Sequence, residues 1–460
     1  MNDNYVLLIG LYSIIGLTVS AVTITNYLRE RKLTGILIVR IMFLIVYSIV
    51  PISTLVAVNN GTLAYKMRAL DLSENGINEL LLMAVFSFIG YLSLEIGYRS
   101  NFKIVIRRKP MLYSNNQSYF DRVFSSRRLN SAAILMSIIS IVALFMWSAG
   151  FGGISGVIEY GRVIRSGYTV DNISNSMGFM KHFVPFGLFS SIIFLALFRT
   201  EKRVIYFLEF LVMFVISIIY SVANDGRAPF MMYLVSVLIL WIMTAKNQYT
   251  RKNKIWIVII VIIAYLLITN MDNILFLLRT GTFGTQQTDS NVFTFLADEF
   301  SFTVRNAQSS QEALKDGETF RIFKDLVAAL FSLLPSRFTP EGVVKLQTIN
   351  TQYWMGDFTY YGGKPTDLMA ASLYELWYLG IIVWPFLYGV VVKKLDKYIE
   401  ILKDTVYGKI LFVQLIYQFA KTVGYADLSL IALNVFYLVI CHIIVMLFCP
   451  KIVISTSEQR

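Results

Sequence analysis

Long apolar stretches alternate with shorter polar connections along almost the whole chain. About 20 apolar residues are needed for a helix to cross a hydrocarbon layer of ~30 Å. Eleven stretches meet that requirement, at about 5–26, 36–57, 77–97, 131–149, 179–198, 204–222, 229–245, 255–271, 366–390, 405–422 and 429–449. The pattern predicts an all-α polytopic membrane protein, a single transmembrane domain over 1–460 with about 11 transmembrane helices and ten or twelve as the nearest alternatives.

Two polar segments are longer than the other connections. Residues 98–130 carry eight basic side chains around a Ser/Asn-rich stretch, which predicts a basic cytoplasmic loop lying on anionic lipid. Residues 272–365 carry eight basic and ten acidic side chains together with many phenylalanines. A segment of that length and apolar content is typical of a functional loop rather than a linker, so we expect one large extracytoplasmic loop.

An amphipathic helix is predicted within the large loop, from about 318 to 334. Its apolar positions recur at helical spacing and form one stripe, and Pro335 ends the pattern. The side chains of Arg321, Lys324 and Asp325 fall off the stripe. Such a helix is expected to lie on the outer membrane face or to cap the bundle. The stripe consists of Phe320, Phe323, Val327, Leu330, Phe331 and Leu334.

Composition and charge agree with a membrane protein and give it an orientation. The chain is 56% hydrophobic with a mean hydropathy of +0.62, which excludes a water-soluble globule of 460 residues. Twenty-four Lys and Arg residues fall in one set of connections and seven in the short connections of the other set. The positive-inside rule then predicts an outer N-terminus and a cytoplasmic C-terminus. Arg40 and Lys409 are expected to reach the inner headgroups from their spans.

The net charge and the two cysteines bear on nucleic-acid, disulfide and metal sites. Anionic lipid headgroups are a sufficient partner for the net charge of +12, so no nucleic acid is expected. Cys441 and Cys449 lie eight residues apart in the last predicted span, where they cannot pair without unwinding it. We expect no disulfide framework, no metal site and no cofactor.

The first candidate site is the connection that opens the seventh predicted span, with Asp225, Gly226 and Arg227. A guanidinium there would lie at the outer interface and could bind a phosphate through two parallel hydrogen bonds, and the glycine would allow close backbone approach. Tight turns favour the same residue types for backbone reasons, so a plain turn with an arginine reaching the headgroups is the alternative.

The second candidate site is the loop that leads into the ninth predicted span. Gly-Gly-x-Pro-Thr, at 362–366, predicts a loop clamped onto a helix start. Glu375 lies some nine residues into the span, where facing lipid would cost a few kcal/mol. It is therefore expected to face the bundle interior or a wet cavity. Tyr360, Tyr361, Gly362, Gly363 and Pro365 form the loop that precedes it.

Together these features resemble the Wzy-type polymerases of O-antigen and other oligosaccharide repeat units. The resemblance rests on many spans, a large outer loop late in the chain, the Gly226-Arg227 turn, and the Gly/Pro loop before the helix with Glu375 and Gly380. It covers the whole chain in architecture and about forty residues in motif. Between Glu375 and Gly380 the chain has Leu-Trp-Tyr-Leu, which departs from the family's usual Tyr and Asn-Phe.

The resemblance implies glycosyl transfer at the outer face of a bacterial plasma membrane. A glycan on a polyprenyl diphosphate would move onto another lipid-linked repeat unit, without metal, and a chain-length regulator protein is a further implied partner. A diphosphate leaving group needs cations, and Arg227, Arg279, Arg305 and Arg337 are the candidates. An acceptor hydroxyl needs a base. The candidate bases are Asp225, Asp357, Asp367 and Glu375, with Tyr353, Tyr360 and Tyr361 as sugar-stacking surfaces.

Three rival functions remain open at this stage. O-antigen ligases share the architecture, but that family typically has a histidine in its large loop and this loop has none, so His182 is the residue on which that alternative depends. A flippase for lipid-linked oligosaccharide would be expected to show internal repeats and charges near the midplane, and neither is visible. A glycosyltransferase using polyprenyl-phosphate sugars would be expected to have an acidic pair in its first outer loop, where Asp71 and Glu74 are separated.

Overall fold

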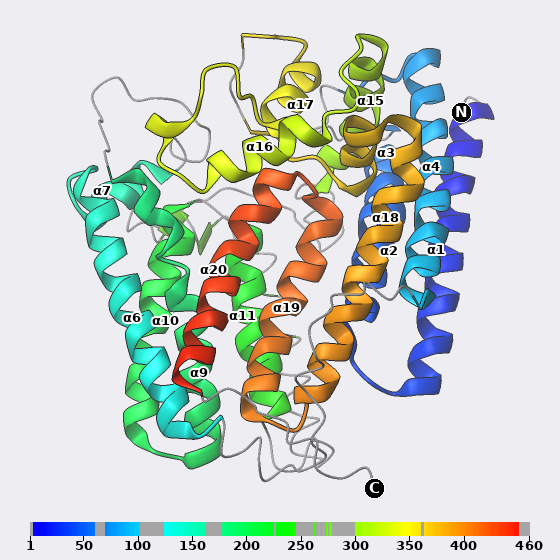
Figure 1. Ribbon diagram of the computed structural model, residues 1–460. Coiled ribbons are helices and arrows are strands. Elements are labelled where there is room, and N and C mark those ends of the chain that lie inside the picture. The colour runs from blue at the N-terminus through cyan, green and yellow to red at the C-terminus, as the bar shows by residue number, and fades with distance from the viewer. Residues whose placement is uncertain are drawn as a thin grey trace, which may run out of the picture.

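The computed structural model describes most of the chain. The described residues are 3–59, 70–101, 124–161, 177–224, 227–244, 300–359 and 363–449, together with single positions at 262, 266, 270, 273, 274, 276 and 277. All elements within these ranges are helices, which confirms the all-α class (Figure 1).

The helices of the first half of the chain are α1 (Asp3–Glu30), α2 (Gly35–Leu44), the π-helix η1 (Ile45–Ile49), α3 (Val50–Asn59), α4 (Glu74–Arg99), α6 (Ser126–Ala149), α7 (Ile154–Glu159), the 3-10 helix η3 (Gly178–His182), α9 (Phe186–Glu201), α10 (Val204–Ala223) and α11 (Arg227–Met243). Those of the second half are α15 (Phe302–Lys315), α16 (Ile322–Ser332), the 3-10 helix η4 (Ser336–Phe338), α17 (Leu346–Met355), α18 (Leu368–Leu402), α19 (Val406–Gly424) and α20 (Leu428–Phe448).

Within the described ranges, eight helical segments are long and apolar enough to cross a membrane. They are Asn4–Glu30, Gly35–Asn59, Glu74–Arg99, Ser126–Ala149, Gly178–Glu201, Val204–Ala223, Leu368–Leu402 and Leu428–Phe448. Helices α11 and α19 occupy two further stretches for which spans were predicted, and most of the predicted span 255–271 lies outside the described residues, as does most of the basic loop 98–130. The protein is thus a polytopic, helical membrane protein.

Two hydrophobic cores hold the bundle together. The first joins α1, α2, α4 and α18, and the second joins α6, α9, α10 and α20. Helix α19 contributes side chains to both, for example Phe412 to the first and Tyr407 to the second. Helices α4 and α18 approach most closely through glycines: a Cβ at Gly97 would lie 2.1 Å from the Phe386 carbonyl oxygen. Small residues allow this backbone contact between membrane helices.

Arg40 corrects one expectation from the sequence. Its side chain is buried, and its guanidinium donates to both carboxylate oxygens of Glu95 of α4, at 2.6 and 2.8 Å. The prediction that Arg40 reaches the headgroups is therefore wrong. A guanidinium that is removed from water needs a paired charge, and the buried carboxylate of Glu95 provides one through two hydrogen bonds. The two residues lie 55 positions apart in the sequence, so no local pattern indicates the pair.

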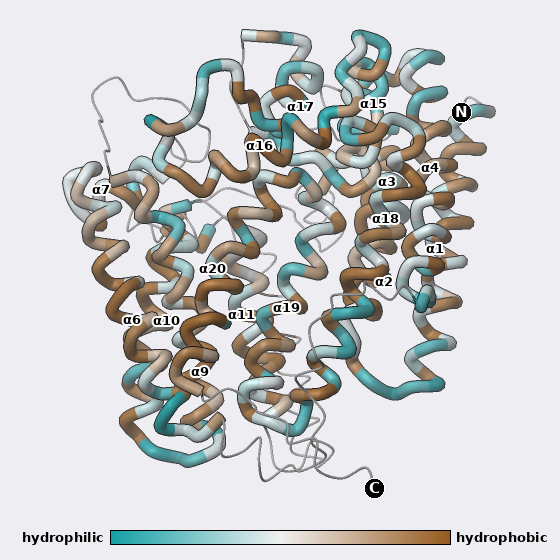
Figure 2. Tube along the Cα trace, viewed as in Figure 1, coloured by the Kyte–Doolittle hydropathy of each residue, from teal (hydrophilic) through white to brown (hydrophobic). Residues whose placement is uncertain are grey.

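Helices α15, α16 and α17 form a polar layer across one end of the bundle, at the top of Figure 1. The N-terminus of α1 lies on the same side, and the C-terminal end of α20 on the other. Figure 2 shows hydrophilic residues gathered in this layer and at the opposite turns, with hydrophobic residues along the bundle between them. Residues 300–359 thus make up most of the large loop predicted over 272–365, and they are folded.

Helix α16 occupies the segment where the amphipathic helix was predicted. The residues of the apolar stripe point outward, with Phe323 78% and Leu330 68% exposed. Of the three charged residues off the stripe, Arg321 and Asp325 are 3% and 0% exposed, whereas Lys324 is exposed. The sequence pattern predicted the two faces of the helix but not the burial of Arg321 and Asp325, which depends on polar partners that the protein beneath α16 supplies.

Candidate functional site

Glu375 lies near the end of α18 that faces the polar layer, where that helix is interrupted. It is buried, as the sequence predicts, and neither of its carboxylate oxygens has a hydrogen-bond partner among the residues that the structure describes. The next residues leave the helical region, with φ −138° and ψ 24° at Leu376 and φ 55° and ψ −151° at Trp377. A Cβ at Gly380 would lie 1.8 Å from the Ser372 carbonyl oxygen, so the break requires glycine there. Strained, unsatisfied positions of this kind concentrate at functional sites.

Two more buried carboxyl groups face Glu375 from neighbouring elements. Asp325 comes from α16 and Asp427 from the start of α20, and the charges of both act on Glu375. Arg321 supplies the cation: its Nη1 donates to Glu318 at 2.8 Å and its Nη2 to Asp325 at 3.2 Å. We refer to these five residues as the carboxyl cluster. One guanidinium faces four carboxyl groups, so the cluster favours keeping a proton at neutral pH.

The pKa of Asp325 reflects the charges of the other members of the cluster. Burial raises the pKa of its carboxyl to about 6, Arg321 opposes that rise, and the charges of Asp427 and Glu318 add to it. Its Oδ2 atom has no hydrogen-bond partner within the described part of the chain. A carboxyl with this pKa exchanges protons in the range where acid–base chemistry takes place at physiological pH.

Asp427 has a structural role that Glu375 lacks. Its side chain caps α20 by accepting hydrogen bonds from the backbone N–H groups of Ser429 at 2.7 Å and Leu430 at 3.1 Å. It also accepts from the N–H of Gln347 at 2.8 Å, which attaches the first turn of α17. Burial raises its pKa, and these three donors oppose the rise. Glu375, in contrast, accepts no hydrogen bond from any described residue, so its replacement breaks none.

The predicted Gly/Pro loop lies beside this cluster and is clamped onto α18. Asn306 of α15 donates to the Pro365 carbonyl at 2.9 Å and to Asp367 at 3.1 Å. Asn350 of α17 donates to the Asn306 side-chain oxygen at 2.9 Å. Asp367 caps α18 and also accepts from the Tyr47 hydroxyl of η1 at 2.7 Å. Three elements of the fold, α15, α17 and η1, therefore fix the end of α18 that carries Glu375.

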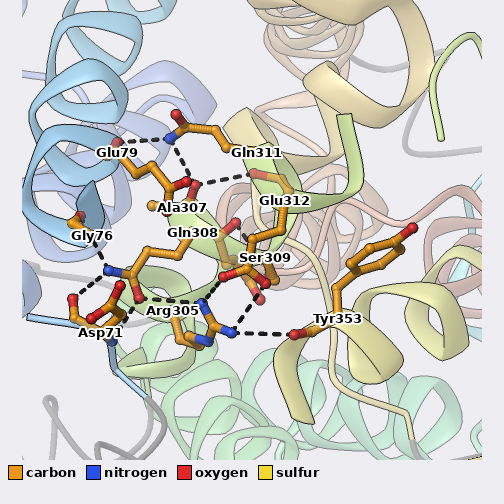
Figure 3. A network of polar contacts seen from close by, with 12 residues as sticks. Asp71, Gly76, Glu79, Arg305, Ala307, Gln308, Ser309, Gln311, Glu312 and Tyr353 are labelled. Carbon is orange, nitrogen blue, oxygen red and sulfur yellow. Dashed lines mark hydrogen bonds and ion pairs between the residues drawn. The ribbon is translucent and has the colours of Figure 1, made fainter. Parts of the chain in front are cut away.

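The Nη1 and Nη2 atoms of Arg305 hold α15 in place (Figure 3). Its guanidinium donates to both carboxylate oxygens of Glu312, at 2.7 and 3.2 Å, and to the Tyr353 carbonyl of α17 at 3.2 Å. The neighbouring Gln308 donates to the Asp71 carbonyl at 2.6 Å, which ties α15 to the start of α4. These contacts favour a structural role for Arg305, although the sequence placed it among the substrate-binding candidates.

The structure brings few of the other predicted residues to the carboxyl cluster. Arg227 begins α11, and Arg337 lies exposed in η4 with its guanidinium 4.9 Å from the Phe338 ring centre. Gly363 lies beside Gln347, and His182, on which the ligase alternative depends, ends η3 next to Lys181. The predicted site residues outside the described part of the chain are Asp225, Gly226, Arg279, Tyr360, Tyr361 and Gly362.

Sequence reasoning missed three groups that shape the site. The sequence placed Arg321 and Asp325 off the apolar stripe and gave no sign of their burial, because an Arg and an Asp four residues apart on a helix are usually an exposed pair. The Asn306–Asn350 contact joins residues 44 positions apart and leaves no local pattern. The one signal available was the Asp before an apolar run, typical of a helix cap, which applies to both Asp367 and Asp427.

Comparisons with protein-family models, curated proteins and solved structures give no match for this chain.

Proposed function

We propose that this protein polymerises polyprenyl-diphosphate-linked oligosaccharide repeat units at the outer face of a bacterial plasma membrane. In this proposal the chain has eleven spans, an outer N-terminus and a cytoplasmic C-terminus, and the layer of α15, α16 and α17 lies outside. The observation that carries the proposal is Glu375, a buried carboxyl at a helix break beneath that layer, with no hydrogen-bond partner in the described ranges. A buried, unpaired carboxyl is costly and is retained where chemistry needs it.

The reaction needs a base, a cation and a defined order of bond changes. In its ionised form Glu375 accepts the proton of an acceptor sugar hydroxyl, and the hydroxyl oxygen then bonds to the anomeric carbon of the donor glycan. The bond from that carbon to the diphosphate oxygen breaks, and the lipid diphosphate leaves with the electron pair. Arg227, at the start of α11, is the proposed cation for the developing charge. Asp325 and Arg321 tune the proton affinity of the cluster.

Support for a membrane-surface reaction comes from where the polar residues gather. The carboxyl cluster and the Gly/Pro loop both lie at the end of the bundle covered by α15, α16 and α17. On the sequence, this is the side whose short connections are poor in Lys and Arg, so the positive-inside rule favours the outside. Lipid-linked repeat units carry their sugars at that level of the membrane.

Deletion of the gene in its native host, followed by gel analysis of surface polysaccharide, tests the proposal. One anchored repeat with no ladder supports a polymerase, and an unattached ladder would instead indicate a ligase. Complementation with Arg227→Ala should give no ladder at normal membrane levels. Arg203→Ala, an exposed arginine in the turn between α9 and α10, is the matched control and should restore the full ladder. A normal ladder with Arg227→Ala would remove that residue from the mechanism.

A flippase for lipid-linked oligosaccharide is the second candidate, and one observation favours it. Discontinuous membrane helices with buried polar groups are typical of transporters, and α18 is interrupted directly after Glu375. The same deletion strain separates the two functions. Loss of every exported repeat would support transport, whereas export of single repeats would support the polymerase.

A further inference from the structure

The outward face of α16, together with the residues that flank this helix on both sides, is apolar and lies at the rim of the bundle. Its large side chains are between 42% and 78% exposed. They are Phe320, Phe323, Leu326, Val327, Leu330, Leu334 and Phe338. We call these seven side chains the α16 apolar face. A contiguous apolar surface of this kind on a folded protein marks a contact with another apolar phase.

The opposite face of α16 is attached to the protein by polar contacts. Arg321 donates through its backbone N–H to the Tyr374 carbonyl at 3.1 Å and through its side chain to the Val344 carbonyl at 3.2 Å. Asp325 and Ser332 are buried on the same side, and Ala328 and Ala329 let the helix pack closely. The orientation of α16 is therefore fixed by its inner contacts. A helix in water would expose Arg321 and Asp325 and bury the phenylalanines.

The surroundings of the α16 apolar face identify what covers it. Helix α16 packs against α20 and α18, two helices of membrane-spanning length, and α18 exposes large apolar side chains such as Leu379 and Ile382 directly after its break. Two exposed basic residues, Lys324 and Arg337, lie within the same segment. Long basic side chains at the edge of an apolar helix face reach lipid phosphates while the apolar side chains enter the acyl boundary.

We propose that the α16 apolar face is embedded in the phospholipid leaflet on the polar-layer side of the bundle, with α16 lying flat at the level of the headgroups. The occupant is the lipid leaflet itself. Because the inner face of α16 carries Asp325 and Arg321 of the carboxyl cluster, that cluster lies next to lipid and not beneath a water-exposed cap. If the proposed function holds, the lipid anchor of the substrate approaches the cluster along α16.

Site-directed spin labelling in liposomes tests this placement without any activity assay. Cys441 and Cys449 are first replaced by Ala, and single cysteines are introduced as Phe323→Cys and Leu330→Cys. Glu341→Cys, at an exposed position after η4, is the matched control outside the helix. Each variant is labelled with a nitroxide and reconstituted in phosphatidylcholine and phosphatidylglycerol. Relaxation by oxygen, which concentrates in lipid, is compared with relaxation by a water-soluble nickel chelate.

The expected result is that the labels at 323 and 330 respond several-fold more to oxygen than to nickel, whereas the label at 341 responds more to nickel. A stronger nickel response at 323 and 330 would place the face in water and overturn the proposal. Spin–spin broadening at 323 that disappears on dilution with unlabelled protein would also overturn it, because a second copy would then cover the face. These spectra do not test the proposed polymerase function, which is tested by the gel analysis of surface polysaccharide.

Discussion

Helices α15 and α16 belong to the same polar layer, yet each contradicts the usual relation between polarity and burial. Helix α15 is rich in polar side chains, and Asn306, Gln308 and Ser309 are all buried. Helix α16 is apolar along one face, and that face is exposed. In α15 these buried side chains find partners in α4, α17 or the loop before α18, whereas in α16 only the polar face finds partners. Polar complementarity, and not hydropathy, decides which face of each helix turns inward.

The largest expected effect comes from removing Arg321, the cation of the carboxyl cluster. Arg321→Ala leaves Asp325 buried without its ion-pair partner, so we expect a loss of about 3–5 kcal/mol in unfolding free energy. Lys324→Ala, three residues away on the exposed side, is the matched control and should change stability by less than about 0.5 kcal/mol. Thermal unfolding in detergent measures both. Equal losses of stability in the two variants would mean that Arg321 is not a buried ion-pair partner of Asp325.

The pH dependence of stability sharpens the same contrast. Burial raises the pKa of Asp325 to about 6, above its ordinary value of 3.8, so the folded state binds this proton more tightly than the unfolded state. Its contribution is fully present below about pH 4 and is lost as the pH rises through about 6. The effect amounts to about 3 kcal/mol at most. Asp325→Asn should remove this slope from the melting temperature measured between pH 4 and 7, and an unchanged slope would assign it to another group.

Glu375 and Asp427 should respond in opposite directions to the same chemical change. Glu375→Gln abolishes any buried charge at this position and breaks no hydrogen bond to a described residue, so the protein should become more stable, by about 1 kcal/mol. Asp427→Asn weakens a helix cap that also holds Gln347, so stability should fall by about 1 kcal/mol. Melting temperatures of the two variants, compared with wild type, decide this. A destabilised Glu375→Gln variant would indicate that the carboxylate has a structural partner.

The smallest effect is expected on the outward face of α16. Phe323→Ser removes an exposed ring that touches little protein, so its unfolding free energy in detergent should change by less than about 0.5 kcal/mol. Ala328→Leu, on the inner face of the same helix, should cost about 1–3 kcal/mol because it overpacks a buried contact. Denaturant titration of both variants checks the difference. A large loss from Phe323→Ser would place that ring inside the protein.

The arrangement of the spans could be predicted because apolar length is a local property. The stretches 5–26, 77–97 and 131–149 coincide with α1, α4 and α6 to within a few residues. The presence of α16 was also predictable from its period, as was the burial of Glu375 from the cost of a carboxylate facing lipid. Local periodicity thus gives the helices and the level at which the site lies.

The partners within the polar layer could not be predicted, because they join segments far apart in sequence. Arg305 meets the Tyr353 carbonyl across 48 residues and Arg40 meets Glu95 across 55. A periodic stripe says that a helix has two faces, but only the surface beneath α16 determines which one turns inward. The polar character of α15 likewise indicates solvent until α4 and α17 are known to cover it.

The central claim, that Glu375 is the base for chain extension, is tested most directly with purified protein in liposomes supplied with its lipid-linked repeat unit. Polymer length is followed by gel for wild type, Glu375→Gln and the capping variant Asp427→Asn. The account predicts that Glu375→Gln is folded, with a melting temperature at or above that of wild type, and forms no product longer than one repeat. A normal polymer ladder from folded Glu375→Gln would contradict the account.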